Sequence, residues 1–349
     1  MLSVLRTYAS MQILARATTS IVTVDSDVYS VDTTNHDSSV AVFAVSTNNK
    51  YVEKAIITLS LIRQFNDHQQ GWSYFLVGDF SAFWVREIRK NMITPLIFKT
   101  DIFKSSRPEF PRECYWWSVM PQRFLMMGYP LSLFVDGGDV VALNDFDMHE
   151  VYSLVHGKTT MGAVRRDCQL GSTEEFNCGV LWFDNLLANS TQFWKRFVAA
   201  YQRVERIGKA FNDQTVLNFM VKQHPSHPCH VHVASLSVRW NVNCHGIQSN
   251  SAARQYIADR PPFFFHFVIP HSSNPFCRHK PSASLKPQFF DELARRAWYT
   301  YLMHEMCLRL LGRLASWPVK FKARENYNLT CPHIVHSRGS KLRKFQPFS

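Results

Sequence analysis

The chain has 349 residues and a formal net charge of +12, with 46% hydrophobic and 19% charged residues. This length and apolar content suit one large α/β domain or two medium ones, and they exclude a disordered protein. No run of about 18 uncharged apolar residues occurs, so a transmembrane helix is not expected. None of the eight cysteines forms a C-x-x-C pair, which excludes a zinc ribbon or a thioredoxin motif.

The positive charge is concentrated near the C-terminal end. Residues 318–349 carry seven lysines and arginines against one glutamate. We expect a solvated basic tail, and the alternative is peripheral contact with an anionic membrane. Nucleic acid is not an expected partner, because the aromatic residues are not interleaved with the basic ones. Residues 1–38 show no clear signal peptide and are expected to be a poorly ordered extension, so localisation stays open between soluble and peripheral.

The chain from residue 39 onward alternates between strand and helix patterns. The apolar run 39–45 is typical of a buried strand, and apolar residues recur at helical spacing over 52–62. A second strand near 74–77, a helix near 81–91 and a third strand near 95–98 follow. This order predicts a mostly parallel sheet with crossover helices, in which ligands bind at the carboxyl ends of the strands.

The next strand leads into an unusual acidic segment. After a helix at 113–129, the apolar run 131–135 continues directly into Asp-Gly-Gly-Asp at 136–139. Buried carboxylates are costly unless they are paired or bind a metal, and glycines allow the backbone to turn tightly. Asp136 and Asp139 therefore either bind Mg²⁺ or Mn²⁺ or form a turn with helix-capping side chains.

Two later segments give weaker signals. Residues 287–316 show helical spacing and are expected to form a helix packed on the domain, with an interfacial amphipathic helix as the alternative. The histidines between 224 and 232 fit no standard zinc spacing, so a polar loop leading into a strand is expected there.

Five further segments each form a distinct motif. In chain order they are T-N-N-K-Y (47–51), L-F-V-D-G-G-D-V-V-A-L-N-D (133–145), F-N-C-G-V-L (176–181), N-D-Q-T-V-L-N (212–218) and F-H-F (265–267). In this order they resemble the nucleotide-sugar glycosyltransferases of GT-A fold. The closest resemblance is to glycosyltransferase family 8, which includes glycogenin and bacterial lipopolysaccharide galactosyltransferases. The resemblance spans about 45–276.

The resemblance implies an α/β GT-A domain with a mostly parallel central sheet flanked by helices over 39–285. A C-terminal helix at 286–317 and the basic tail would follow it. The implied activity is metal-dependent transfer of a sugar, with retention of configuration, from a nucleotide-diphosphate sugar to a glycan, protein or lipid acceptor. The expected donor is a UDP-hexose.

The same resemblance assigns roles to individual residues. It implies a Mn²⁺ or Mg²⁺ site and a pair of catalytic residues beside a nucleotide-sugar pocket. The metal ligands would be Asp136, Asp139 and His266, the catalytic residues Asp213 and Gln214, and the nucleotide-sugar contacts Thr47, Asn48, Tyr51, Asp136, Gly137, Asn177 and Gly179.

The chain also departs from the family pattern. Where the family has D-x-D, this chain has D-x-x-D, so alignment back from Asp145 places Gly137 on the first aspartate and Asp139 on the second. Asp136 then needs a one-residue bulge, and the family lysine after the histidine falls on Ser272. Two alternatives stay open. One is an inactive relative that binds nucleotide or sugar, and the other is a nucleotidyltransferase, which would release pyrophosphate.

Overall fold

Seven strands form the central sheet in the order β3-β2-β1-β4-β7-β6-β8. The computed structural model describes residues 39–46, 49–69, 71–97, 111–166, 175–208, 213–243, 256–257, 259–267 and 288–314. The strands are β1 (Val40–Ser46), β2 (Trp72–Gly78), β3 (Thr94–Ile97), β4 (Leu131–Val135), β6 (Met161–Arg166), β7 (Glu175–Asp184) and β8 (Val233–Leu236). β1 pairs in parallel with β2 and β4, β2 with β3, and β6 with β8, whereas β7 runs antiparallel to β4 and β6. The expected mostly parallel α/β sheet is thereby confirmed.

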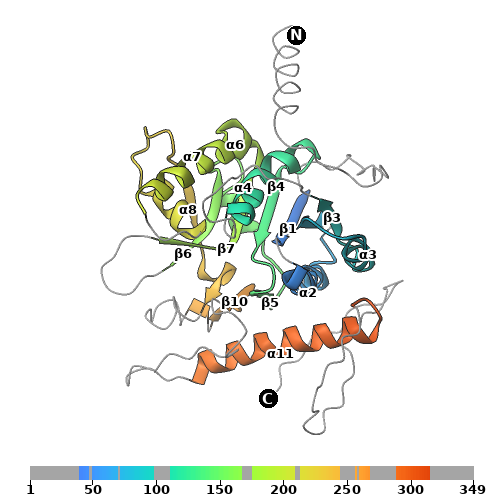
Figure 1. The fold of residues 1–349 in the computed structure, drawn as a ribbon. Helices are drawn as coiled ribbons and strands as arrows, with labels where there is room; N and C mark the ends of the chain where they lie inside the picture. The colour runs from blue at the N-terminus through green and yellow to red at the C-terminus, as the bar shows by residue number, and fades with distance from the viewer. Residues whose placement is uncertain are drawn as a thin grey trace.

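Helices cover both faces of this sheet (Figure 1). They are α2 (Asn49–Phe65), α3 (Ala82–Lys90), α4 (Pro111–Met126), α5 (His149–Leu154), α6 (Asn185–Ser190), α7 (Phe193–Arg206), α8 (Asp213–Val221) and α11 (Gln288–Leu310), with a 3-10 turn η2 at Val238–Trp240. A smaller sheet joins β5 (Val140–Ala142), β10 (Phe264–His266) and β9 (Val242–Asn243).

The alternation of side chains along β1 separates two hydrophobic cores. Val40, Val42 and Ala44 pack with α2, α3, the small sheet and α11. Ala41 and Phe43 face the opposite side and pack with α4, α7 and α8. Because successive strand residues point to opposite faces, a fully apolar strand such as β1 must be covered on both sides, as the sequence predicted.

α4 ends earlier than the expected residue 129. Gly128 has a φ of +90°, the left-handed conformation that glycine adopts without strain. The Gly128 amide donates to the Leu125 carbonyl at 3.0 Å, and the Tyr129 amide donates to the Phe124 carbonyl at 2.9 Å. These bonds satisfy the last carbonyls of the helix and turn the chain toward β4.

α11 packs against α2 and β5 (Figure 1). Its buried face includes Ala297, Tyr301 and Leu308, which belong to the same core as α2. Arg309 forms ion pairs with Glu305 and with Glu53 of α2. Among the helices that the structure describes, none combines the length and the apolar character needed to cross a bilayer. The basic tail at 318–349 lies outside the described residues, as does the extension at 1–38.

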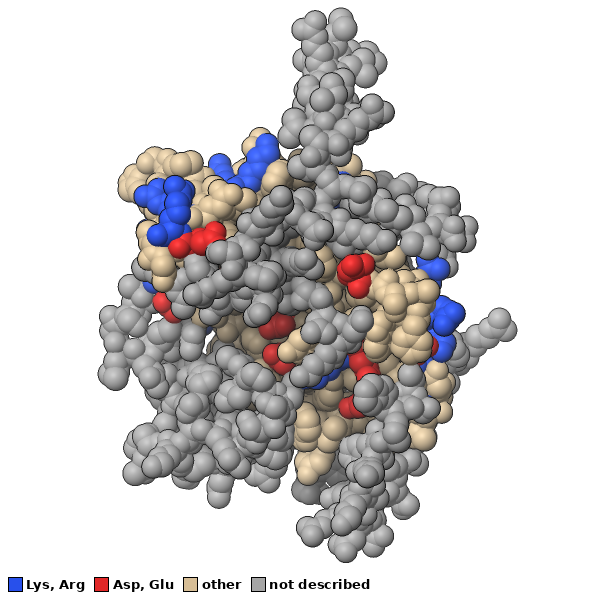
Figure 2. Space-filling view, in the orientation of Figure 1, with Lys and Arg blue, Asp and Glu red and all other residues tan. Residues whose placement is uncertain are grey.

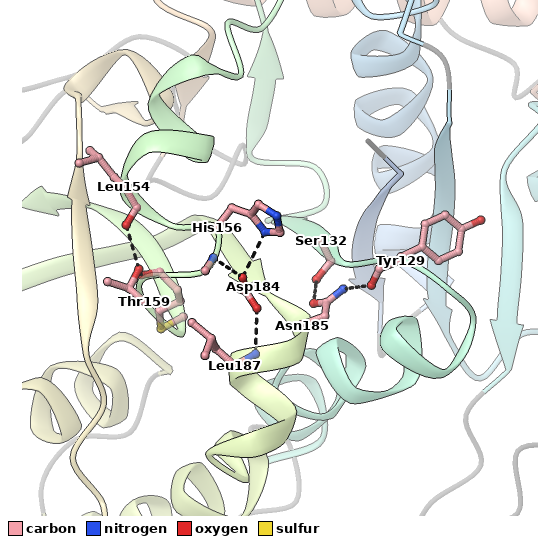
Figure 3. A network of polar contacts seen from close by, with 10 residues as sticks. Tyr129, Ser132, Leu154, His156, Thr159, Asp184, Asn185 and Leu187 are labelled. Atoms are coloured by element: carbon pink, nitrogen blue, oxygen red, sulfur yellow. Dashed lines mark hydrogen bonds and ion pairs between the residues drawn. The ribbon is translucent and has the colours of Figure 1, made fainter. Parts of the chain in front are cut away.

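A buried polar network holds the edge of the sheet where β7 ends (Figure 3). Asp184 accepts hydrogen bonds from the amides of Leu187 and Gly157, at 2.8 and 2.7 Å, and faces His156 Nδ1 at 3.2 Å. Next to it, Asn185 accepts from Ser132 Oγ at 2.7 Å and donates to the Tyr129 carbonyl at 2.8 Å. The network thus joins β7 and α6 to the start of β4.

We predict that Asp184→Ala lowers the free energy of unfolding by about 2–3 kcal/mol, because it removes the cap of α6 and leaves the Gly157 amide without its acceptor. Asp147→Ala is the matched control, since the exposed Asp147 carboxylate also accepts an amide hydrogen bond, from His149. Urea unfolding of both variants measures the difference. Equal losses in the two variants would contradict this role for Asp184.

A second buried polar contact joins α11 to α2. His304 Nε2 lies 2.9 Å from Ser60 Oγ, and both side chains are buried. Burial, together with the positive charges of Arg313 and Arg63, lowers the pKa of His304 to about 4. The imidazole is therefore neutral at physiological pH in the folded protein, whereas in an unfolded chain it titrates near its ordinary value of about 6.5.

The free energy of unfolding should therefore fall as the pH drops from about 6.5 to about 4. Over this range His304 binds a proton in the unfolded chain but stays neutral in the folded protein. The His304 contribution to this loss is about 3 kcal/mol at most. His304→Gln, which does not titrate, should flatten this part of the stability profile. Parallel profiles for the two proteins over this range would show that His304 is not the responsible group.

Candidate functional site

The acidic segment, residues 136–139, connects β4 to β5 at the carboxyl edge of the sheet. The Asp136 amide donates to the Gly179 carbonyl of β7 at 2.8 Å, and the Asp139 amide lies 3.4 Å from the Asp136 carbonyl. The Asp139 carbonyl accepts from the Phe267 amide at 2.7 Å. The turn is therefore held on one side by the large sheet and on the other by the chain that leaves β10.

Close packing against α2 explains the two glycines of this turn. Gly138 has a φ of +104°, and a side chain at Gly137 would place its Cβ 2.9 Å from the Cβ of Ala55. Thr58, buried on α2, donates to the Val140 carbonyl at 3.0 Å and accepts from the Gly138 amide at 3.3 Å. The extra residue of the D-x-x-D spacing is thus accommodated in a turn that α2 supports.

His266 extends from β10 toward this turn. Its Nε2 lies 3.7 Å from Asp136 Oδ2, and the histidine is buried while the Asp136 side chain is 40% exposed. Gly179 makes room for the imidazole, because a Cβ there would lie 2.2 Å from His266 Cε1. The His266 imidazole therefore packs directly on β7, and its Nε2 edge points to the partly exposed carboxylate of Asp136.

Asp213, at the start of α8, completes the charged centre. Burial, together with the nearby negative charge of Asp136, raises the pKa of Asp213 to about 6. The Gln214 amide donates to Asp213 Oδ1 at 2.7 Å and partly offsets this rise, as does the proximity of His266. Asp136, Asp213 and His266 thus act on one another electrostatically, although they lie far apart in the sequence.

Asn218 attaches α8 to β7 beside this centre. It accepts from the Phe176 amide at 2.7 Å and donates to the Phe176 carbonyl at 3.0 Å. Asn218 lies one helical turn beyond Asp213 and Gln214, so this double hydrogen bond sets the start of α8 against the strand that carries Asn177 and Gly179. The motif at 212–218 contains Asn218, but its spacing alone does not indicate this partner.

The remaining predicted residues are less closely grouped. Thr47 and Asn48 lie outside the described residues, and Tyr51 is exposed in the first turn of α2, with Lys54 Nζ 5.5 Å from its ring centre. The histidines of the 224–230 loop make local contacts instead, such as His224 with Ser226 and His227 with Arg203.

The pair formed by Asp136 and His266 fits a divalent cation. Two atoms that bind one ion at about 2.1 Å must lie within roughly 4.2 Å of each other, and their separation is 3.7 Å. Over the described part of the chain, no three His, Cys, Asp or Glu side chains are grouped to hold a metal. Asp139 as a third ligand therefore stays a prediction.

Figure 2 shows Lys and Arg gathered over α7 and over α3. Acidic side chains lie beside the α7 group and nearer the middle of the view, where basic atoms are also visible, so charges of both signs are present on this face.

Comparison with solved structures finds glycosyltransferases. An active-site glutamine-to-glutamate mutant of LgtC matches with a TM-score of 0.50 and 15% identity, over 73% of this chain and 95% of that chain. GlyE of Streptococcus pneumoniae TIGR4 matches with a TM-score of 0.49 and 16% identity, over 79% and 64% of the two chains. For mouse xyloside xylosyltransferase 1 the TM-score is 0.45 and the identity 12%, over 66% and 100%. No protein-family model and no curated protein sequence matches the chain.

At these identities the likeness establishes the fold. The seven-stranded, mostly parallel sheet with helices on both faces is the GT-A fold of glycosyltransferases. The chain spans 64% of GlyE and 46% of the bifunctional glycosyltransferase WbbM, so it covers less than two thirds of either.

We predict that Gly179→Ala displaces the His266 ring and lowers the free energy of unfolding by about 1–3 kcal/mol, because the added methyl group overlaps the imidazole. The same substitution in a His266→Ala background should cost much less, since the ring is then absent. Thermal and urea unfolding of the four proteins in this cycle give the coupling. Equal costs in both backgrounds would show that the ring is not what Gly179 accommodates.

Proposed function

We propose that this chain is a glycosyltransferase that moves a sugar from a nucleotide-diphosphate sugar, expected to be a UDP-hexose, to an acceptor hydroxyl. The observation that carries the proposal is the convergence of Asp136, His266 and Asp213 at the carboxyl edge of a GT-A sheet. The sequence motifs at the same positions support it independently. The acceptor is left open among a glycan, a protein and a lipid.

The electrostatics of this centre favour a bound cation. Burial and the charge of Asp136 both oppose ionisation of Asp213. A divalent ion beside Asp136 would relieve that repulsion, since a nearby positive charge stabilises both carboxylates. Asp136 and His266 would hold it, with Asp139 as the third predicted ligand. The mixture of carboxylate and imidazole favours Mn²⁺ over Mg²⁺.

Sugar transfer requires stabilisation of the leaving diphosphate. The bond between the anomeric carbon and the diphosphate oxygen breaks with its electron pair on that oxygen. The acceptor oxygen bonds to the same carbon, and its proton passes to the departing diphosphate. A Mn²⁺ held by Asp136 and His266 would supply positive charge to stabilise the negative charge that develops on the diphosphate. Tyr51, with Thr47 and Asn48, would contact the nucleotide, as the family resemblance implies.

Asp213 and Gln214 would act on the sugar. The anomeric carbon gains positive charge as its bond to the leaving group lengthens, and nearby carboxylate and amide oxygens stabilise that charge. Asp213 is at the N-terminus of α8, and Asn218 fixes that end of the helix against β7. Its carboxylate is thus preorganised. Retention of configuration is part of this proposal and follows from the family resemblance.

The direct test is a donor-hydrolysis screen, in which purified protein is incubated with UDP- and GDP-sugars in Mn²⁺ or in EDTA and nucleotide release is measured. We predict metal-dependent release from one donor, reduced on the order of 10²–10³-fold in Asp136→Asn. Asp147→Asn, an exposed aspartate of the following segment, is the control that should retain activity.

Three results would contradict the proposal. Release of pyrophosphate in place of UDP would indicate a nucleotidyltransferase. No release, together with no binding of UDP and Mn²⁺ in calorimetry, would refute the assignment of this site. Binding without release, when the assay also includes a panel of sugar acceptors, would indicate an inactive nucleotide-binding relative.

A further inference from the structure

Two buried asparagines connect β7 to His266 through a chain of hydrogen bonds. The Gly179 amide donates to Asn177 Oδ1 at 2.8 Å, and Asn241 Nδ2 donates to the same oxygen at 2.7 Å. Asn241 Oδ1 lies 3.2 Å from His266 Nδ1. Asn177, Asn241 and His266 are 4%, 1% and 6% exposed, so solvent does not compete for these contacts.

The bond from the Gly179 amide determines which atom donates and which accepts in each of the hydrogen bonds that follow. A backbone amide can only donate, so the Asn177 atom that faces Gly179 must be the carbonyl oxygen. The Asn241 atom that faces that oxygen must then be its NH₂ group. The other terminal atom of Asn241 is therefore an oxygen, which can only accept, so His266 Nδ1 must carry a proton.

We infer that Asn177 and Asn241 are positioning residues that hold His266 in its Nδ1–H tautomer and present the Nε2 lone pair toward Asp136. A neutral imidazole protonated at Nδ1 has its free electron pair on Nε2, which is the form that binds a metal through Nε2. The tautomer is a property of the protein alone. Its consequence for metal binding rests on the proposed function.

A carboxylate from α5 binds two of the residues that precede Asn241 in the chain. Glu150 accepts hydrogen bonds from the Ser237 amide, from Ser237 Oγ at 2.8 Å and from Trp240 Nε1 at 3.0 Å. Trp240 is fully buried, with its ring centre 5.3 Å from that of Trp182. Trp240, the residue before Asn241, is therefore fixed by these contacts. Its fixed position orients the side-chain amide of Asn241 toward His266.

This arrangement also changes the expected role of Asn177. A carbonyl oxygen has two lone pairs, and those of Asn177 Oδ1 are engaged by the Gly179 amide and by Asn241. Only its Nδ2 group is left for a donor sugar. The primary role of Asn177 is thus to orient Asn241, and through it His266.

The tautomer can be read directly by NMR in the protein labelled with ¹⁵N-histidine, at about pH 8, where an imidazole is neutral. The His266 resonance is assigned by its loss in His266→Gln. We expect a protonated Nδ1 and an unprotonated Nε2 in the unsubstituted protein. Asn241→Leu, which removes the acceptor, should abolish that signature.

Asn144→Ala is the matched control, since Asn144 donates to the Pro262 carbonyl nearby but takes no part in this chain. If Asn241→Leu does not fold, Asn177→Ala removes the first acceptor and should mix the two tautomers. A protonated Nε2 in the unsubstituted protein, or an unchanged signature in a folded Asn241→Leu, would overturn the inference.

Mn²⁺ binding separates this inference from the proposed function. If both hold, Asn241→Leu should weaken Mn²⁺ binding by about 10–100-fold in calorimetry, as loss of a partner that orients a metal-binding histidine does. If the tautomer behaves as expected but the unsubstituted protein binds no Mn²⁺, with or without UDP, the positioning role stands and the metal-dependent function fails.

Discussion

The site depends on the antiparallel pairing of β7 with β4. This pairing places Val135 opposite Val180 and allows the Asp136 amide to donate to the Gly179 carbonyl. One strand thereby supplies the anchor of the acidic turn, the space for the His266 ring and the first acceptor of the asparagine chain. A shift of one residue in this register would turn Asn177 and Gly179 to the opposite face of the sheet. The anchor of the acidic turn, the space for the His266 ring and the acceptor for Asn241 would then no longer lie together.

The same region concentrates charge that the fold does not neutralise by itself. Asp213 and Asp136 repel each other, and the centre lies where parallel strands end and their side chains meet. Burial of Asp213 beside Asp136 is costly for stability, because a buried carboxylate loses hydration. The acidic turn and the start of α8 are each held by several hydrogen bonds, and His266 is held by its contact with Asn241.

Support for the turn comes from elements outside the central sheet. α2 closes it through Thr58 and Ala55, and the small sheet holds it through Phe267. The Phe267 ring contacts Trp298 of α11, with ring centres 6.3 Å apart. Burial raises the pKa of Tyr301 on the same helix, and the charges of Glu305, Glu53 and Asp139 add to that rise. The C-terminal helix is therefore part of the scaffold that positions the acidic turn.

Local pattern in the sequence indicated the first four strands of the chain, the helices between them, the helix after residue 287 and the acidic turn, because apolar periodicity and glycine spacing act over a few residues. The family motifs also indicated Asp136, Asp213 and His266. Only the tertiary structure decided that Asn241 contacts His266, that Gly179 lies under the imidazole, and that α11 supports the turn. These contacts join residues that are 25 to 87 positions apart, and strand register and packing, which no local pattern encodes, bring them together.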